Sequence, residues 1–313
     1  MSRTTAGSWR GAWIAACFSL VAAATPAVAQ TARTPGASPD ADSQEEGPIG
    51  EAPDDEPTAE DVFLRDRRVL LGRGDVVVDV GQFYSRRDDL QVLSIDGAVG
   101  LATFEQRALT TFLVGRVGIF GETEVFASTS FNRLDSRLFS GLTTFGSSGD
   151  TWFGATALGV RRTLLREGAG RPDVVLTLSG QFATDRAPAA LGGGVVVVKG
   201  VDPVVLFAST SYFRTFETDI DGQDVPPVDV VDVSMGYGLG LNDTVAISTA
   251  VSGRFAGTTT IQGVTASAPS SFSARLGLTA WLAEGLYIEP SVSFGLSGPG
   301  DAFAFGVTLP FAF

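Results

Sequence analysis

Apolar residues alternate with small or polar ones at every second position from Asp75 to the last residue of this chain. The alternation falls into segments of about ten residues, which is the length and pattern of strands in membrane barrels. In the stretch 231–241, for example, Val, Met, Tyr and Leu alternate with Asp, Ser and Gly. Such a strand turns one face to an apolar medium and the other to water. The alternation predicts a β-sheet, but a soluble β-sandwich would show it too. The two ends of the sequence and the connections between strands therefore have to distinguish a sandwich from a membrane barrel.

The final segment favours a membrane barrel over a soluble β-sandwich, because it is aromatic on one face and is the last strand of the sequence. Its alternating large residues are Phe303, Phe305, Val307, Leu309, Phe311 and Phe313. In a soluble protein this row would be an exposed aromatic edge and an aggregation hazard. An amphipathic strand that ends on phenylalanine resembles the C-terminal strand by which outer-membrane barrels are recognised for insertion. We therefore predict location in the outer membrane, with two partners: outer-membrane lipid, and the barrel-assembly machinery through the strand ending at Phe313.

The N-terminus has the organisation of a secretory signal peptide. Arg3 and Arg10 precede an apolar run, and small residues at 27–29 supply a cleavage site. The run is shorter than the roughly 20 apolar residues of a transmembrane helix. We predict that the segment 1–29 is a cleaved signal peptide. The alternative is a lipoprotein acylated on Cys17, which would need a lipobox ending at that residue.

The chain contains no histidine, and its one cysteine lies in the predicted signal peptide. These absences exclude a Ser-His-Asp triad, a Cys-His pair, a disulfide and a histidine metal site in the mature chain. We expect no enzymatic activity, no catalytic residue, no metal and no cofactor. The net charge is −13, and the stretch 40–66 alone carries eleven carboxylates against Arg65. This acidic balance argues against nucleic-acid binding.

Two short segments lie between the signal peptide and the alternating region. Residues 30–57 are rich in Pro, Gly, Ala, Ser and acidic residues, which predicts a disordered periplasmic tether. Residues 58–72 begin with a capping pattern at Thr58 and continue with apolar residues until Gly72. They predict a short periplasmic helix that sits at the rim of the barrel or plugs its lumen. The barrel itself is predicted over 73–313.

The predicted fold class is all-β, as a transmembrane, antiparallel, up-and-down β-barrel of about 12 strands. The expected strands are 75–85, 105–116, 123–133, 151–165, 172–183, 191–200, 203–215, 228–241, 244–256, 270–282, 286–296 and 302–313. Their connections alternate between long and short, as do the extracellular loops and periplasmic turns of bacterial barrels. The long loops include 86–104, 134–150, 216–227 and 257–269, and the short turns include 242–243 and 283–285. An even number of strands leaves both termini in the periplasm.

Three turn motifs carry a family resemblance. The stretch 116–124 is an arginine-glycine hairpin turn with an acidic strand start, 165–173 is a glycine-rich turn before a strand, and 201–207 reads VDPVVLF. They are similar to motifs of a bacterial outer-membrane family that is described as transporter-like and linked to phenol degradation by the meta pathway. The resemblance covers the barrel from Asp61 onward and departs at 182–185, where a Phe-Pro-Thr-Gly run is expected. It implies transport and hints at aromatic cargo, and it names no catalytic residue.

The faces expected to line the lumen carry mostly Ser, Thr, Ala and Gly, which leaves space inside a barrel of this size. Isolated charges interrupt them, and the candidate lumen-facing residues are Asp79, Glu124, Asp232, Arg254, Arg275 and Glu289. Mixed charges could set an electrostatic preference for solutes, as charged rings do in pores. Alternatively, they pair across strands and only fill the interior. The acidic loop 219–224 suggests calcium, but its spacing differs from that of an EF-hand and favours a solvated loop.

These observations predict a channel or transporter for passive uptake of small-molecule solutes, with hydrophobic or aromatic compounds as the suggested cargo. The alternative is a structural or adhesive barrel whose lumen is closed by the helix around Phe63 and which transports nothing. A membrane-embedded hydrolase that uses only carboxylates and hydroxyls is a third hypothesis, and the absence of histidine disfavours it.

Overall fold

The computed structural model describes residues 70–95, 98–140, 143–168, 170–201, 203–220, 223–242, 244–261, 264–267, 270–283, 285–297 and 302–313. The predicted signal peptide (1–29), the predicted tether (30–57) and residues 58–69 of the predicted helix lie outside this part of the chain. Leu70, Leu71 and Gly72, with which that helix was expected to end, are described and are not helical. Among the described residues, no helix has the length and apolarity needed to cross a membrane.

Regular structure in the described part of the chain consists of seventeen strands. They are β1 (Val76–Ile95), β2 (Ala98–Phe120), β3 (Thr123–Ser140), β4 (Thr143–Phe153), β5 (Ala157–Leu165), β6 (Asp173–Gln181), β7 (Ala190–Val201), β8 (Val204–Thr215), β9 (Thr218–Ile220), β10 (Gln223–Val225), β11 (Asp229–Asn242), β12 (Val245–Ala256), β13 (Thr258–Ile261), β14 (Val264–Ser267), β15 (Ser271–Ala283), β16 (Leu286–Ser297) and β17 (Phe303–Ala312).

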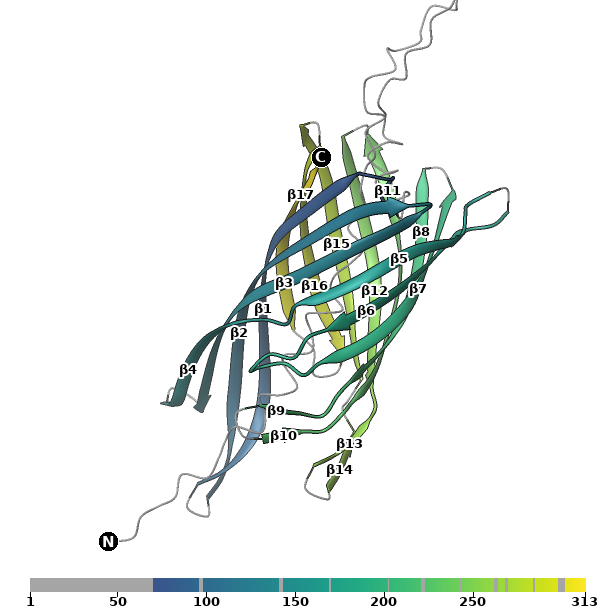
Figure 1. The fold of residues 1–313 in the computed structure, drawn as a ribbon. Coiled ribbons are helices and arrows are strands. Elements are labelled where there is room, and N and C mark those ends of the chain that lie inside the picture. Colours follow the sequence, from purple (N-terminus) through teal and green to yellow (C-terminus); the bar gives the residue numbers. More distant parts are fainter. Residues whose placement is uncertain are drawn as a thin grey trace, which may run out of the picture.

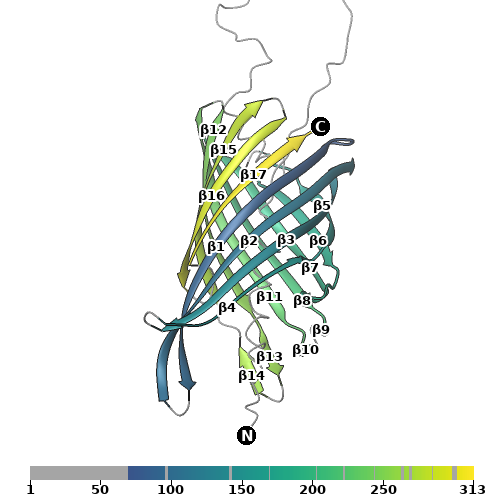
Figure 2. The same ribbon diagram turned by 90° about the vertical axis from the view of Figure 1, so that its left-hand side faces the viewer.

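Twelve of these strands close into a ring (Figures 1 and 2). Neighbours in the ring follow the chain in up-and-down order, and only β4, β9, β10, β13 and β14 stand outside it. Strand β17 returns to pair antiparallel with β1, from Val77 opposite Ala312 to Arg86 opposite Phe303. Phe313 extends this seam, because its backbone N–H donates to the Val76 carbonyl at 2.9 Å. The predicted closed antiparallel barrel of twelve strands is therefore confirmed.

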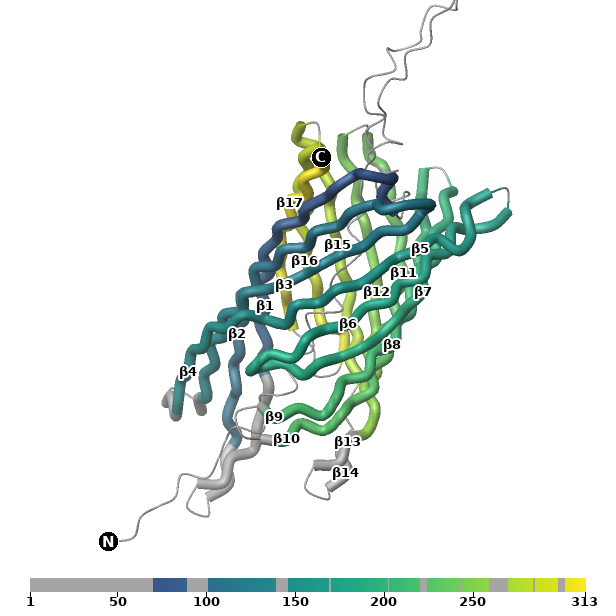
Figure 3. The backbone as a smooth tube through the Cα atoms, viewed as in Figure 1, coloured from purple at the N-terminus to yellow at the C-terminus, as the bar shows by residue number. Residues whose placement is uncertain are grey.

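The two ends of the barrel differ in their connections. The start of β1, the last residue and the short turns gather at one end, which we call the short-turn end. One of these turns contains Gly121 and Glu122, both with positive φ, between β2 and β3. At the opposite, long-hairpin end, several strands continue beyond the ring as paired extensions (Figure 3).

These extensions correct the expectation of long loops. The stretches 86–104 and 134–150 lie largely within the β1–β2 and β3–β4 pairings. The stretches 216–227 and 257–269 contain the β9–β10 and β13–β14 hairpins. Beyond the apolar band both faces of a hairpin can meet water, so alternation no longer marks the strand although backbone pairing continues.

The predicted strand 151–165 is interrupted in the structure. Strand β3 pairs with β5 over residues 123–128 and with β4 over residues 131–140. Gly154 lies in the interruption, where its N–H donates to the Ser130 carbonyl at 2.8 Å. A Cβ at this position would collide with the Ser130 hydroxyl. Only glycine lets the chain approach β3 this closely.

The ring has an apolar outer face and a mixed inner face. Each of its twelve strands carries at least one exposed large apolar residue, such as Leu113 on β2, Met235 on β11 and Leu276 on β15. The alternate positions face the lumen and include the buried Val77 and Glu124. A water-soluble protein rarely exposes so continuous an apolar surface, whereas a barrel that faces lipid requires one.

Candidate functional site

Phenylalanine rings line the lumen beside glycines of the neighbouring strand. In each pair, the ring occupies the space that a glycine Cβ would take. These pairs are Phe83 with Gly306, Phe112 with Gly81, Phe126 with Gly159, Phe207 with Gly236, and Phe213 with Gly192. Cross-strand pairing places each ring opposite its glycine on the inner face. The lumen wall is therefore partly aromatic, with the rings accommodated by the missing side chains.

These rings were not predicted from the sequence, from which an inner face mostly of Ser, Thr, Ala and Gly was expected. The available signal was parity: Phe83 and Asp79 are separated by an even number of positions, so both point to the same side of β1. What the sequence could not supply was the register that sets each ring opposite a glycine. Within the lining, Phe83 and Phe112 stack with their centroids 5.5 Å apart.

A buried charge cluster lies in the lumen toward the short-turn end. Arg116 Nη2 lies 3.1 Å from Asp79 Oδ2, and both side chains are only 2% exposed. Arg161 Nη1 lies 3.3 Å from Glu124 Oε1, and the Arg161 guanidinium lies 4.8 Å from the Phe126 ring centroid. Asp79 and Glu124 are sequence candidates, whereas their partners Arg116 and Arg161 are not. The partners come from β2 and β5, and only the register brings them together.

The residues before β1 occupy this same end of the lumen. The Leu71 backbone N–H donates to Glu124 Oε2 at 3.4 Å, and its side chain is buried against Val77. Leu70 packs against an apolar cluster with Val175 on β6 and Val205 on β8. Because β8 stands halfway around the ring from β1, Leu70 and Leu71 together bridge the lumen.

Asp232 and Arg254 form a second ion pair inside the barrel. They lie opposite each other on β11 and β12, with Arg254 Nε at 2.7 Å from Asp232 Oδ1 and Nη2 at 3.1 Å from Oδ2. Both oxygens of the carboxylate therefore accept from one guanidinium fork, which is the strong geometry for such a pair. Nearby, the Ser209 and Ser234 hydroxyls lie 2.7 Å apart. This wall of the lumen is polar.

Arg275 on β15 lies at the meeting point of the polar and aromatic walls. Its Nη2 donates to the Ser291 hydroxyl at 2.9 Å, and its guanidinium lies 5.6 Å from the Phe83 ring centroid. Glu289, the remaining candidate, occupies the same side of β16 as Ser291, two positions away. A cation beside aromatic rings can hold a planar solute that carries a negative charge.

No metal site is formed by the described residues, among which no group of three or more Asp, Glu, His or Cys side chains could hold an ion. The acidic stretch 219–224 falls in the β9–β10 hairpin, where Asp219 and Asp224 are opposite each other. Asp221 lies outside the part of the chain that the structure describes.

No family model matches the chain. Among solved structures, an outer-membrane channel from Pseudomonas putida F1 is similar, with a TM-score of 0.57, 9% identity, and coverage of 84% of this chain and 100% of that one. The translocator domain of the autotransporter NalP from Neisseria meningitidis has a TM-score of 0.50 and 11% identity, with coverage of 78% of this chain and 90% of that one. At these identities the similarity shows the fold alone. The chain has the fold of outer-membrane β-barrels.

Proposed function

We propose that the chain spans the outer membrane as a channel through which small solutes pass passively. In this placement the short-turn end faces the periplasm and the long hairpins face outward, as in bacterial barrels generally. The apolar outer face on all twelve strands supports insertion in lipid. Similarity to a solved outer-membrane channel is consistent with this role. Export by the signal peptide 1–29 and insertion through the strand ending at Phe313 belong to the same proposal.

The cargo that fits this lumen best is a small hydrophobic or aromatic compound. The observation that carries this choice is the row of inward phenylalanines beside glycines, with Arg275 next to Phe83. Aromatic faces favour apolar and planar solutes, and the guanidinium adds a place for a negative group. The phenol-degradation resemblance points to the same class of compound. No catalytic residue is needed for passive passage, and we propose none.

A second candidate function is a structural or adhesive barrel with a closed lumen. It is favoured by one observation, namely that Leu70 and Leu71 already bridge the short-turn end. A barrel closed in this way would pass no solute until the segment moved.

Planar-bilayer recording separates these two functions. The mature chain from Gln30 is compared with a chain that starts at Gly74 and therefore lacks Leu70 and Leu71. Conductance in both forms supports an open channel, and conductance in the shorter form alone identifies the segment as a plug. If both are silent although both barrels are folded, the structural role is the better proposal.

Cargo is tested by flux of benzoate and of glucose into proteoliposomes. We expect benzoate to enter faster than glucose, and Arg275→Gln to reduce the benzoate rate selectively. Arg166→Gln, at an exposed site on the short-turn end, is the matched control. Equal rates for both solutes, unchanged by Arg275→Gln, would remove the argument for aromatic anions.

A further inference from the structure

We propose that the outer face of β1, β2 and β3 binds the phosphate groups of a lipid head group at the long-hairpin end. The site is an outer arginine cluster of seven side chains: Arg86, Asp88, Glu105, Arg107, Arg133, Asp135 and Arg137. The proposal uses the membrane placement given above, and it is independent of what passes through the lumen.

Register places the cluster on the outside of the barrel. Arg86 is opposite Arg107, which in turn is opposite Asp135. Arg86 lies two positions beyond Tyr84 on β1, and Arg133 lies two positions beyond Phe131 on β3. Tyr84 and Phe131 are large apolar residues of the exposed face, 37% and 44% exposed. Positions two apart on a strand share a face, so the arginines point away from the lumen.

The cluster begins where the apolar band ends. On the neighbouring strand β17, Phe305 is opposite Tyr84 and Phe303 is opposite Arg86. Phe131 packs edge-on against Phe153 at 5.5 Å between centroids. A girdle of aromatic residues marks the depth at which a barrel leaves the hydrocarbon and enters the head groups. The arginines therefore stand at the depth of lipid phosphates, with acyl chains against the rings.

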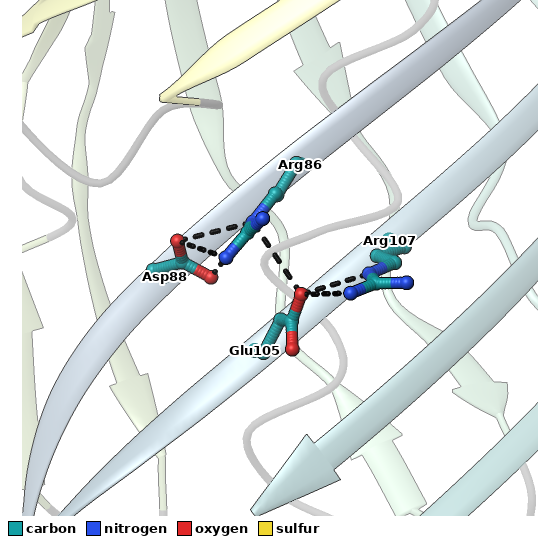
Figure 4. Close-up of polar contacts among 4 residues, drawn as sticks. All are labelled: Arg86, Asp88, Glu105 and Arg107. Atoms are coloured by element: carbon teal, nitrogen blue, oxygen red, sulfur yellow. Dashed lines mark hydrogen bonds and ion pairs between the residues drawn. The ribbon is translucent and has the colours of Figure 1, made fainter.

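The charges of the cluster leave an excess of one positive charge, with four guanidiniums against three carboxylates. Glu105 is shared, because its Oε1 lies 2.7 Å from Arg107 Nη2 and 3.4 Å from Arg86 Nε (Figure 4). Asp88 binds Arg86 at 3.0 Å and Asp135 binds Arg133 at 3.3 Å. Arg137 makes no ion pair within the described part of the chain.

The arrangement fits a phosphate ester. Arg107, Arg133 and Arg137 line a hollow of about 150 Å³ together with Glu105 and Asp135. Guanidinium forks bind phosphate oxygens in pairs, which makes arginine the preferred residue for this contact. The Arg86–Asp88 and Arg133–Asp135 pairs join exposed side chains, and such pairs contribute little to stability. Arg86 and Arg133 can therefore exchange these carboxylates for the oxygens of a doubly charged phosphate without a large loss.

The test measures binding of bis-phosphorylated lipid A by the full mature chain in phosphatidylcholine vesicles, with a fluorescent lipid A as the ligand. Chemically dephosphorylated lipid A serves as the comparison ligand. We expect the double variant Arg107→Gln/Arg137→Gln to bind lipid A at least about tenfold more weakly, since charge-assisted contacts are lost. Glu105→Gln should bind no more weakly than the parent, because it removes a competing carboxylate. Arg166→Gln, which removes an exposed, paired arginine at the other end of the barrel, should change nothing.

Three results would overturn the proposal. The first is equal binding of phosphorylated and dephosphorylated lipid A, and the second is no loss of binding in the double variant. The third is displacement of lipid A by inorganic phosphate at an equal concentration, which would mean that the cluster binds a small anion and not a lipid. Folding of every variant is verified by heat-modifiable mobility in gel electrophoresis, so that a failure to insert is not scored as lost binding.

Discussion

Replacing Arg116 by methionine removes the guanidinium from the buried cluster at the short-turn end of the lumen. In the parent chain this group lies 3.1 Å from Asp79 Oδ2, and both side chains are 2% exposed. Methionine is shorter than arginine, but it keeps an unbranched apolar side chain and removes the charge. The substitution therefore tests what the ion pair contributes to folding of the barrel, and the double variant below separates this contribution from the change in size.

The expected loss of stability follows from the distance between the Asp79 and Arg116 charges and from the burial of both side chains. Two unit charges 3.1 Å apart attract by about 5 kcal/mol at the effective dielectric of about 20 that suits protein interiors. Breaking a buried pair from one side typically costs about 3–5 kcal/mol, since the remaining charge stays in a poorly solvated place. We therefore expect Arg116→Met to lower the free energy of unfolding by about 3–5 kcal/mol. In the double variant Asp79→Leu/Arg116→Met the loss should be much smaller than the sum of the two single losses.

The assay is equilibrium unfolding by guanidinium chloride in phospholipid vesicles, followed by tryptophan fluorescence. Arg166→Met is the control, because Arg166 pairs with Glu122 but its side chain is 74% exposed. Its expected loss is below about 1 kcal/mol. If Arg116→Met were as mild as Arg166→Met, or if the losses of Asp79→Leu and Arg116→Met were additive, the reasoning about a buried coupled pair would be refuted.

Three further outcomes are expected. Gly81→Ala should lower the free energy of unfolding by about 1–3 kcal/mol in the same assay, because the new Cβ collides with the Phe112 ring. Gly115→Ala is the control and should be nearly neutral, because a Cβ there has nothing within 4 Å. Equal losses would contradict the packing of phenylalanine rings against lumen glycines. Arg275→Gln should shift the reversal potential toward cation preference in bilayers under a salt gradient, because a positive charge leaves the lumen, and an unchanged potential would place Arg275 outside the solute path. Glu122→Gly should raise the unfolding midpoint slightly, since Glu122 has a φ of 65° and glycine adopts that conformation without strain. A lower midpoint would show that the ion pair with Arg166 stabilises the fold by more than the backbone strain destabilises it.

The strands of the ring could be predicted from the sequence where one face is continuously apolar. Strand β17 shows this best, because large residues from Phe303 to Phe311 occupy alternate positions without interruption. The extension of β1 beyond residue 85 could not be predicted, because the charged residues Arg86 and Asp88 occupy positions where the apolar pattern would continue. Its pairing depends on backbone hydrogen bonds, which leave no trace in side-chain pattern.

The candidate site was predictable to the level of single residues but not of pairs. Asp79 and Glu124 stand out as charges at inward parity, and the structure places both at the short-turn end with Arg116 and Arg161. Those arginines were not named as lumen candidates, since Arg116 begins the turn motif 116–124 and Arg161 is followed directly by a second arginine. The pairing of these charges depends on the stagger between neighbouring strands. Alternation within one strand shows which side a residue faces, but it does not show this stagger.

The seam between β1 and β17 also determines how this chain must fold. Val77 pairs with Ala312, which are 312 − 77 = 235 positions apart, so the last contacts of the ring have the greatest sequence separation. Closing so long a loop has an entropic cost that no local contact offsets beforehand, and topologies dominated by such contacts fold slowly. Until β17 arrives, β1 and β16 each present an open edge that could pair with another chain. A folding chain held at this stage would be prone to aggregation, which is a physical reason for the proposed action of the assembly machinery on the final strand.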